Sequence, residues 1–182
     1  LRDMEGETPA DRAHRVALYH VDALTGLFNK RYCESLLNVK DQKKAPYTLF
    51  YMDLNLFKPI NDQYGHVMGD KVLVEVARRL LLCIRSSDHA FRLGGDEFAV
   101  IVGSSLSDEL CRERMQRMRT EITKPMQIDG HILQVGVSCG AAVCPADADN
   151  SEQICELADR RMYEEKEKAH ERMKARYTEE LR

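Results

Sequence analysis

Two short apolar runs, 89–93 and 98–102, flank the tetrapeptide Gly94-Gly95-Asp96-Glu97, and this arrangement constrains the fold more than any other feature of the chain. Two strand-like segments around a tight glycine-containing turn predict a β-hairpin. The hairpin would place two adjacent carboxylates at its tip. An exposed acidic turn is the simplest interpretation of this pair, but the mutual repulsion of two carboxylates favours a cation nearby.

The remaining elements are predicted from periodicity and from turn residues. Helices are expected from Asn29 to residue 37, over 72–84, over 107–124 and from Ser151 to beyond His170, and strands over 47–54 and 132–143. In the helix over 72–84, Glu75, Arg78 and Arg79 are expected on the face opposite the apolar residues. Helices and strands alternate irregularly around a central hairpin. This order predicts an α+β fold, with a mixed or mainly antiparallel sheet flanked by helices.

Composition limits the classes of function. A chain of 182 residues with 43% apolar residues can bury one substantial core, and its net charge of −3 argues against binding to polymeric nucleic acid. The six cysteines show no metal-ligand spacing, so we expect reduced and mostly buried thiols. No apolar stretch approaches the roughly 18 residues that a membrane span requires. We expect a soluble, cytoplasmic domain, and the sequence leaves open whether a full-length protein carries a membrane anchor.

The chain is expected to hold one domain with two flanking segments. Residues 1–20 are polar and are expected to form a linker or a helix from a missing upstream module, such as a sensor domain. The domain itself is expected over 21–172, followed by a C-terminal tail over 173–182. The chain begins at Leu1 rather than at a methionine, which suggests a piece of a longer protein.

A third carboxylate is predicted close to the hairpin tip. Asp53 ends an apolar strand, where a lone aspartate usually caps a turn. If the hairpin pairs beside this strand, Asp53, Asp96 and Glu97 converge on one edge of the sheet. Oxygen ligands of this kind suit Mg²⁺ or Mn²⁺, which are normally shared with substrate phosphates.

The segment 56–70 is expected to be a loop crowded with hydrogen-bonding side chains. Asn61 and Asp70 could recognise the edge of a purine, because a carboxylate accepts the two N–H groups that guanine presents side by side. Lys58 could contact phosphate. In the alternative interpretation, Asp70 only caps the long helix through the helix dipole.

Taken in order, these residues resemble a known family. The segments are Asp22-Ala23-Leu24-Thr25-Gly26-Leu27, Asp53-Leu54-Asn55-Leu56-Phe57-Lys58, Ile60-Asn61-Asp62, Tyr64-Gly65-His66, Gly69-Asp70, Arg92-Leu93-Gly94-Gly95-Asp96-Glu97-Phe98, Val137-Ser138-Cys139-Gly140, Ala158-Asp159, Met162-Tyr163 and Lys166. From about Asp22 to His170 the chain resembles the GGDEF domains of bacterial diguanylate cyclases. The resemblance implies a palm-like nucleotidyl cyclase fold, with a five-stranded, mainly antiparallel sheet and the signature on a β-hairpin.

The resemblance also implies a reaction and a role for each matching residue. Two GTP molecules would be condensed into cyclic di-GMP with release of two pyrophosphates, on a homodimer in which each domain holds one GTP. The metal ligands would be Asp53, Asp96, Glu97 and the backbone carbonyl of Leu54. The catalytic residues would be Asp96, Glu97 and Lys58, with Asp96 the candidate base. The substrate would be bound by Asn61, His66, Asp70, Phe57 and Lys166.

A second ligand site is implied by Arg85-Ser86-Ser87-Asp88, five residues before the signature motif. It resembles the family's Arg-x-x-Asp site, at which cyclic di-GMP inhibits the enzyme. The alternative is a surface ion pair between Arg85 and Asp88.

One residue departs from the family pattern. His170 stands where an arginine is common, so contact with the triphosphate is expected to be weaker there or to come from Lys168 or Arg172. A rival function is a catalytically weak module that binds GTP or cyclic di-GMP and regulates an attached domain. Such relatives typically lose the acidic pair or the strand aspartate, and Asp53, Asp96 and Glu97 all stand here.

Overall fold

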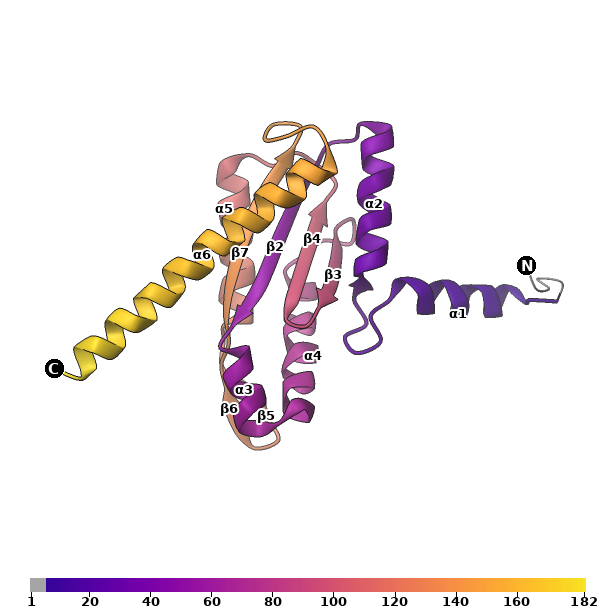
Figure 1. Ribbon diagram of the computed structural model, residues 1–182. Coiled ribbons are helices and arrows are strands. Elements are labelled where there is room, and N and C mark those ends of the chain that lie inside the picture. Colours follow the sequence, from indigo (N-terminus) through magenta and orange to yellow (C-terminus); the bar gives the residue numbers. More distant parts are fainter. Residues whose placement is uncertain (1–5) are drawn as a thin grey trace.

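The computed structural model describes residues 6–182; residues 1–5, at the start of the expected linker, lie outside the described residues. Helices pack on both faces of one central sheet (Figure 1). The helices are α1 Pro9–His20, α2 Lys30–Lys43, α3 Phe57–Tyr64, α4 His66–Leu82, α5 Asp108–Ile122 and α6 Ser151–Glu180. The strands are β1 Phe28–Asn29, β2 Tyr47–Asn55, β3 His89–Gly94, β4 Glu97–Val102, β5 Met126–Ile128, β6 His131–Leu133 and β7 Gly136–Cys144.

The central sheet has the strand order β1-β3-β4-β2-β7. The pairs β3–β4, β4–β2 and β2–β7 are antiparallel, and only the short β1 runs parallel to its neighbour β3. The expected α+β fold with a five-stranded, mainly antiparallel sheet is therefore confirmed, and the sheet is mixed rather than purely antiparallel. The hairpin expected around the Gly94-Gly95 turn is formed by β3 and β4.

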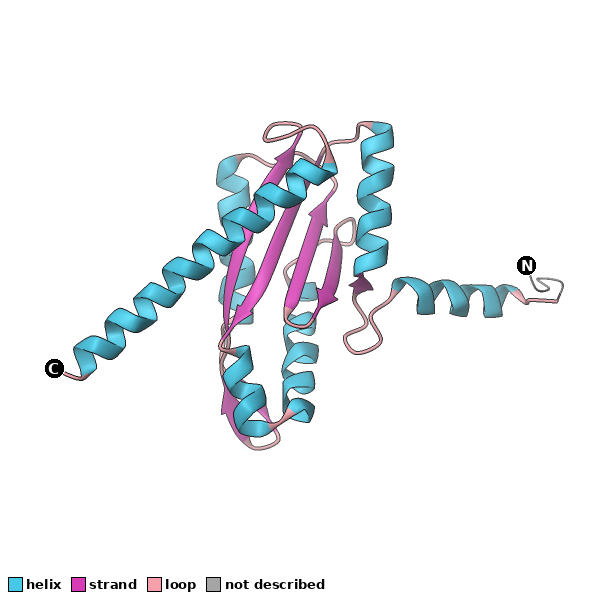
Figure 2. Cartoon of the chain, viewed as in Figure 1, coloured by secondary structure: helices cyan, strands magenta, loops and turns pink. Residues whose placement is uncertain are grey.

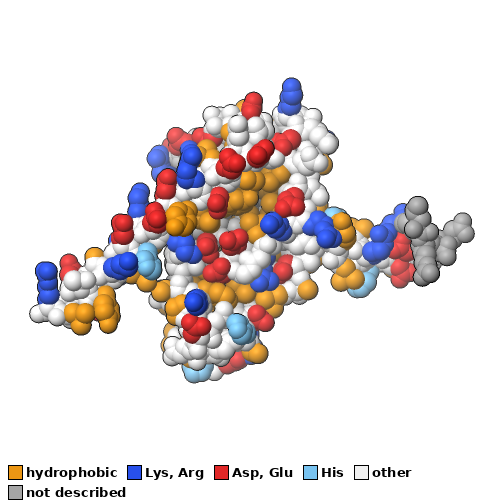
Figure 3. Space-filling model, viewed as in Figure 1, with side chains coloured by type: hydrophobic (Ala, Val, Ile, Leu, Met, Phe, Trp, Pro, Cys, Tyr) orange, Lys and Arg blue, Asp and Glu red, His pale blue; other side chains and the backbone are white. Residues whose placement is uncertain are grey.

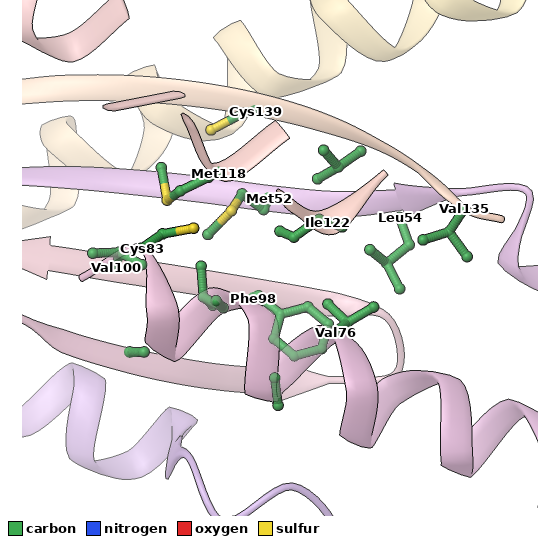
Figure 4. Close-up of a cluster of buried hydrophobic side chains, with 14 of the residues drawn as sticks. Met52, Leu54, Val76, Cys83, Phe98, Val100, Met118, Ile122, Val135 and Cys139 are labelled. Carbon is green, nitrogen blue, oxygen red and sulfur yellow. The ribbon is translucent and has the colours of Figure 1, made fainter. Parts of the chain in front are cut away.

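Each face of the sheet has its own apolar core. Along β2, Phe50, Met52 and Leu54 join the core shared with α4 and α5, whereas Tyr47 and Leu49 join the core shared with α2 and α6. This alternation follows from the two-residue period of a strand. Figure 2 shows α2 and α6 on one face and α4 and α5 on the other. Figure 4 shows the larger core, where Met52, Leu54, Phe98 and Val100 from the strands meet Val76 and Met118 from the helices.

Arg79 lies on the buried side of α4, and the expectation that it lies opposite the apolar face is wrong. Its side chain is 7% exposed, and it donates hydrogen bonds to backbone carbonyls at the end of α5 and beyond, including those of Ile122 (3.2 Å) and Pro125 (3.0 Å). The last carbonyls of a helix lack partners within the helix. Arg79 supplies donors to them and is held by Glu75 at 3.0 Å, so a buried charge here ties α4 to α5.

Several element boundaries also differ from the sequence predictions. The segment expected as a loop over 56–70 consists of α3, a turn at Gly65 with φ +88°, and the first turns of α4. Helix α2 continues to Lys43, beyond its expected end at residue 37, and the strand expected over 132–143 is divided between β6 and β7. Asn150, not Ser151, caps α6, which continues to Glu180 through most of the expected tail.

The flanking helices and the cysteines complete the description. Residues 9–20 form the helix α1, which buries none of its residues and extends away from the sheet (Figure 1). Within residues 6–182, no helix combines the length and apolar character that crossing a membrane demands. All six cysteines are free thiols, and five of them are buried.

Candidate active site

The turn of the signature hairpin depends on two glycines and on hydrogen bonds from Arg92. Gly94 and Gly95 have φ values of +141° and +50°, backbone conformations that glycine adopts readily. The Arg92 side chain reaches back across this turn, where its Nε donates to the Gly95 carbonyl at 3.0 Å. Its Nη1 also donates to Asp22 Oδ1 at 3.1 Å. The Asp22–Arg92 pair therefore ties the turn that follows α1 to the tip of the hairpin.

Two of the three expected carboxylates meet beside this tip. Asp53 lies opposite Glu97 in the β2–β4 register, and the Leu54 amide donates to the Asp96 carbonyl at 3.2 Å. Burial, followed by the negative charge of Asp53, raises the pKa of Asp96 to about 6. A carboxylate whose pKa is raised by burial and by a neighbouring carboxylate indicates a functional site rather than a plain acidic turn.

Asp53 is only partly satisfied by its surroundings. Its Oδ2 accepts a hydrogen bond from Lys166 Nζ of α6 at 2.7 Å, and its Oδ1 is buried without a hydrogen-bond partner among the described residues. A buried polar atom without a partner costs free energy unless a ligand or ion satisfies it. Figure 3 shows acidic side chains gathered in the middle of this face, between the helices that cover it.

Glu97 does not complete a cluster of three carboxylates. Its side chain is exposed, and across residues 6–182 no group of three or more histidine, cysteine, aspartate or glutamate side chains is gathered closely enough to hold a metal ion. The pairing of β2 with the hairpin, which was the condition for the expected convergence, is present. The roles of Asp53, Asp96 and Glu97 as metal ligands stay predictions.

The expected base-recognition residues lie on the α3–α4 helix pair. Asn61 is half-buried on α3, and its Oδ1 has no hydrogen-bond partner among the described residues. A Cβ at Gly69 would lie 1.8 Å from this oxygen and 3.3 Å from Phe57 Cζ, so Gly69 leaves the space that Asn61 occupies. Asp70 is exposed on the next position of α4.

The alternative role of Asp70 as a helix cap does not fit the structure. Helix α4 begins at His66 with Gly65 as its N-cap, and its first turn contains no acidic residue. Asp70 therefore lies beyond the turn in which a carboxylate compensates the helix dipole most effectively. Lys58 and His66 are exposed, and neither makes a side-chain hydrogen bond or ion pair within residues 6–182.

The Arg85–Asp88 segment differs from a simple surface ion pair. Asp88 is 8% exposed, and its Oδ2 accepts the backbone N–H of Arg85 at 2.9 Å and a hydrogen bond from Arg114 of α5. The Arg85 side chain is exposed. Asp88 thus holds the turn and an α5 arginine in place, while Arg85 is left to face solvent.

The residues around Lys166 occupy two different faces of α6. Lys166 and His170 line one cleft of about 410 Å³ together with Lys174. Lys168 and Arg172 line a separate cleft, because they lie about 200° and 240° around the helix from Lys166. The structure therefore does not bring Lys168 or Arg172 to the Asp53–Lys166 pair, and the expectation that they replace an arginine at position 170 is wrong.

Some supporting residues were quoted from the sequence without a role. The Asp22–Arg92 pair is one example. Another is Ser138 of β7, whose hydroxyl accepts from Asn55 at 2.9 Å at the end of β2. Glu165 was not singled out from the sequence at all; it accepts from Arg119 and from the Cys139 amide and so holds the turn of α6 that carries Lys166. No periodic or compositional signal marks these long-range contacts.

Comparisons with known proteins show the family to which the chain is similar. A family model described as "Diguanylate cyclase, GGDEF domain" matches residues 19–172. The chain is 38% identical over 152 residues to diguanylate cyclase DgcS of Shewanella oneidensis, covering 80% of this chain and 49% of that protein. It is 34% identical over 160 residues to diguanylate cyclase A of Treponema denticola, covering 84% of this chain and 43% of that protein.

A solved structure gives the same result for the fold. The GGDEF domain of YfiN from Pseudomonas aeruginosa superimposes with a TM-score of 0.75 at 32% identity, covering 82% of this chain and 90% of that one. The chain spans less than half the length of the two curated relatives named above.

Proposed function

This chain belongs to the GGDEF domain family, and from that premise we propose that it is a diguanylate cyclase that condenses two molecules of GTP into cyclic di-GMP and releases two pyrophosphates. The Asp53–Asp96 pair carries the proposal. It places two interacting carboxylates beside the signature hairpin, one with an unpartnered buried oxygen and the other with a raised pKa. Relatives that are 34% and 38% identical are named diguanylate cyclases.

The donor set fits a divalent cation that prefers oxygen ligands, Mg²⁺ or Mn²⁺. A cation would satisfy the buried Oδ1 of Asp53 and would relieve the repulsion that raises the pKa of Asp96. Asp53, Asp96 and the Leu54 carbonyl would hold it, with Glu97 as a further ligand. When bound, the ion supplies charge neutralisation at the phosphates and lowers the pKa of a hydroxyl that it contacts.

The guanine base is proposed to bind at the α3–α4 helix pair. The Asp70 carboxylate would accept the N1–H and N2–H groups of guanine. Asn61 Oδ1, which is buried without a partner, offers an acceptor, and its amide nitrogen offers donors. Phe57 and His66 would line this pocket. Gly69 keeps it open, since any larger residue would take the place of the Asn61 amide.

The triphosphate is proposed to lie between the base pocket and the carboxylates. Lys58 and Lys166 would neutralise its charge, and Lys166 is already held next to Asp53. His170 lies on the Lys166 face of α6 and extends it. Asp96 would accept the proton of the attacking 3′-hydroxyl. Catalysis would depend mainly on positioning and on charge stabilisation.

Two copies are needed for the complete reaction. Each GTP supplies the 3′-hydroxyl that attacks the α-phosphate of the other, so two hairpins must face each other in a homodimer. The exposure of Gly94, Gly95 and Glu97 at the end of the sheet is compatible with such a meeting.

Product inhibition is proposed to act through Arg85. Its exposed guanidinium can bind a phosphate or a guanine edge in two places at once. Asp88 would keep the turn and Arg114 in position. Calorimetry with Arg85→Ala tests this site, because an affinity for cyclic di-GMP equal to that of the wild type would remove Arg85 from the proposal.

The enzyme activity itself is tested by pyrophosphate release. Purified protein at high concentration, given GTP and Mg²⁺, is expected to release pyrophosphate continuously, and Asp96→Ala is expected to abolish this release. Omission of the metal should have the same effect. If the wild type releases no more pyrophosphate than Asp96→Ala, the chain is a binding module and not a cyclase. An upstream sensor domain in a longer protein is part of the proposal, consistent with the greater length of the relatives.

A further inference from the structure

A second large cleft lies under α6, on the side away from Lys166. It measures about 750 Å³, within the range of small-molecule sites. Figure 1 shows the second half of α6 leaving the sheet, and the cleft lies between this part of the helix, the end of α5 and the adjoining ends of β2 and β7. The residues that line it include Leu56, Lys168, Arg172, Met173 and Arg176.

The cleft is basic although the chain as a whole has a net charge of −3. Five of its side chains are lysine or arginine and only two are carboxylates. Arg119 is paired with Glu165, and Arg161 is paired with Asp147 at 3.2 Å. The other three cations have no ion-pair partner anywhere in residues 6–182; they are Lys168, Arg172 and Arg176.

These three cations repel one another along the helix, with Glu164 and Glu180 one interval beyond the two ends of the row. They follow one another at four-residue intervals, so their side chains stack along one face of α6. Like charges at this spacing destabilise a helix. An anion bound along the row would remove the repulsion. The row is about 12 Å long from Lys168 to Arg176, enough to contact more than one phosphate group.

The cleft also has exposed apolar side chains. Leu56 and Met173 are 45% and 42% exposed, and Val137 and Ala169 lie beside them. A flat aromatic base can pack against such side chains. The Asn55 amide nitrogen donates to Ser138, which leaves its carbonyl oxygen as an acceptor for the edge of the base. A cationic row that shares a cleft with exposed apolar side chains and a free amide oxygen suits a nucleotide.

We propose that this cleft is a second nucleotide site, separate from the Asp53–Asp96 pair and from Arg85. The phosphates bind along Lys168, Arg172 and Arg176, and the base packs on Leu56 and Met173. The ligand is a guanine nucleotide with at least two phosphates, which both GTP and cyclic di-GMP provide. The proposal goes beyond the cyclase reaction, since binding in the cleft requires no turnover.

The site adjoins the catalytic elements at two points. Leu56 has φ +66° and is the residue from which α3 starts, and α3 carries Lys58 and Asn61. Glu165, which faces the cleft, directly precedes Lys166. A nucleotide in the cleft would therefore touch the residues that position both the base pocket and the Asp53–Lys166 pair.

Isothermal titration calorimetry tests the site in a background that removes the other two. The full chain carries Asp96→Ala, Asn61→Ala and Asp70→Ala, which remove the proposed base contacts, together with Arg85→Ala. GTP, cyclic di-GMP and inorganic pyrophosphate are titrated separately in the presence of a chelator. Arg172→Glu with Arg176→Glu reverses the row. Arg160→Glu is the matched control, because Arg160 is an exposed arginine of the same helix that does not line the cleft.

We expect the charge reversal to weaken binding of GTP, cyclic di-GMP or both by about tenfold or more, and Arg160→Glu to change it by less than about twofold. The nucleotide that loses affinity identifies the ligand as substrate or product. Replacing both arginines with glutamine should cause a similar loss and guards against misfolding of the reversed variant. The proposal is overturned if both nucleotides bind the reversed variant as tightly as the background, or if pyrophosphate binds as tightly as either nucleotide.

Discussion

At the scale of single residues, Asp96 links the stability of the fold to the chemistry of the site. Its pKa is raised from 3.8 to about 6 because the carboxyl is partly buried and lies beside Asp53. The folded state therefore holds the proton more tightly than the unfolded state does. The stability contributed by this proton is fully present below pH 3.8 and is lost as the pH rises through about 6.

Asp96→Asn removes this dependence and should stabilise the metal-free protein at neutral pH. With a chelator present, the Tm of the variant is expected to exceed that of the wild type by an amount that grows between pH 3.8 and about 6 and then stays constant. Differential scanning calorimetry at closely spaced pH values measures the difference. Two parallel Tm curves would show that Asp96 is not perturbed as described.

Gly69 provides a test of the base pocket. In Gly69→Ala the new Cβ would lie 1.8 Å from Asn61 Oδ1, so the Asn61 side chain must turn away. Alanine favours a helix more than glycine does, and the global stability should therefore change little. We expect the KM for GTP to rise by about tenfold, because the base would lose its hydrogen bond with the neutral Asn61 amide and would still have to give up its contacts with water.

The control for Gly69→Ala is Gly103→Ala, since a Cβ at Gly103 has no atom within 4 Å. Steady-state kinetics of both variants separate the two outcomes. If Gly69→Ala and Gly103→Ala have the same KM, Asn61 does not contact the substrate.

Residue chemistry was the part of the site that the sequence predicted best. The strand that ends near Asp53 and the hairpin around the Gly94-Gly95 turn followed from the apolar pattern, whereas their pairing was only a condition until the structure showed it. The buried role of Asp88 could not be predicted, because its partner Arg114 lies 26 residues away on α5. The burial of Arg79 could not be predicted either, because its acceptors are backbone carbonyls, which carry no sequence signal.

At the scale of elements, α3 shows why residue propensities alone failed to predict a helix. Pro59 and Gly65 are turn residues, and they made the segment 56–70 resemble a loop. Pro59 is the third residue of α3, where the backbone N–H has no acceptor within the helix and proline is therefore tolerated. Gly65 is the turn residue between α3 and α4. The hairpin and α4 were expected correctly because their apolar spacing is strong.

The contact between α6 and β7 positions Lys166 and can be tested with one methyl group. A Cβ at Gly140 would lie 2.2 Å from the Ala158 carbonyl oxygen and 2.4 Å from the Met162 nitrogen, both backbone atoms of α6. Gly140→Ala should therefore push α6 away from β7. We expect the free energy of unfolding to fall by about 1–3 kcal/mol.

The same displacement should move Lys166 from Asp53 and lower kcat in the molecules that remain folded. Chemical denaturation and steady-state kinetics measure the two effects, again with Gly103→Ala as the control. An unchanged stability would mean that α6 does not pack on β7 as closely as described.

At the scale of the whole molecule, the chain presents half of a reaction site. The carboxylates, the proposed base pocket and Lys166 all lie on one domain, which in the proposed reaction holds one GTP. A single domain acting alone could at most join the 3′-hydroxyl and the α-phosphate of the same nucleotide. Formation of a dinucleotide requires a second copy, and α1 and the distal half of α6 extend from opposite sides of the domain without covering the hairpin (Figure 1).

The most direct test of this account is the mass of the product made from a mixture of GTP isotopologues. The protein is incubated with Mg²⁺ and equal amounts of unlabelled and ¹⁵N-labelled GTP, and the nucleotides are analysed by mass spectrometry. The account predicts cyclic di-GMP in light, mixed and heavy forms, with the mixed form twice as abundant as either pure form. A cyclic mononucleotide in only two masses, or no cyclic product at all, would contradict it.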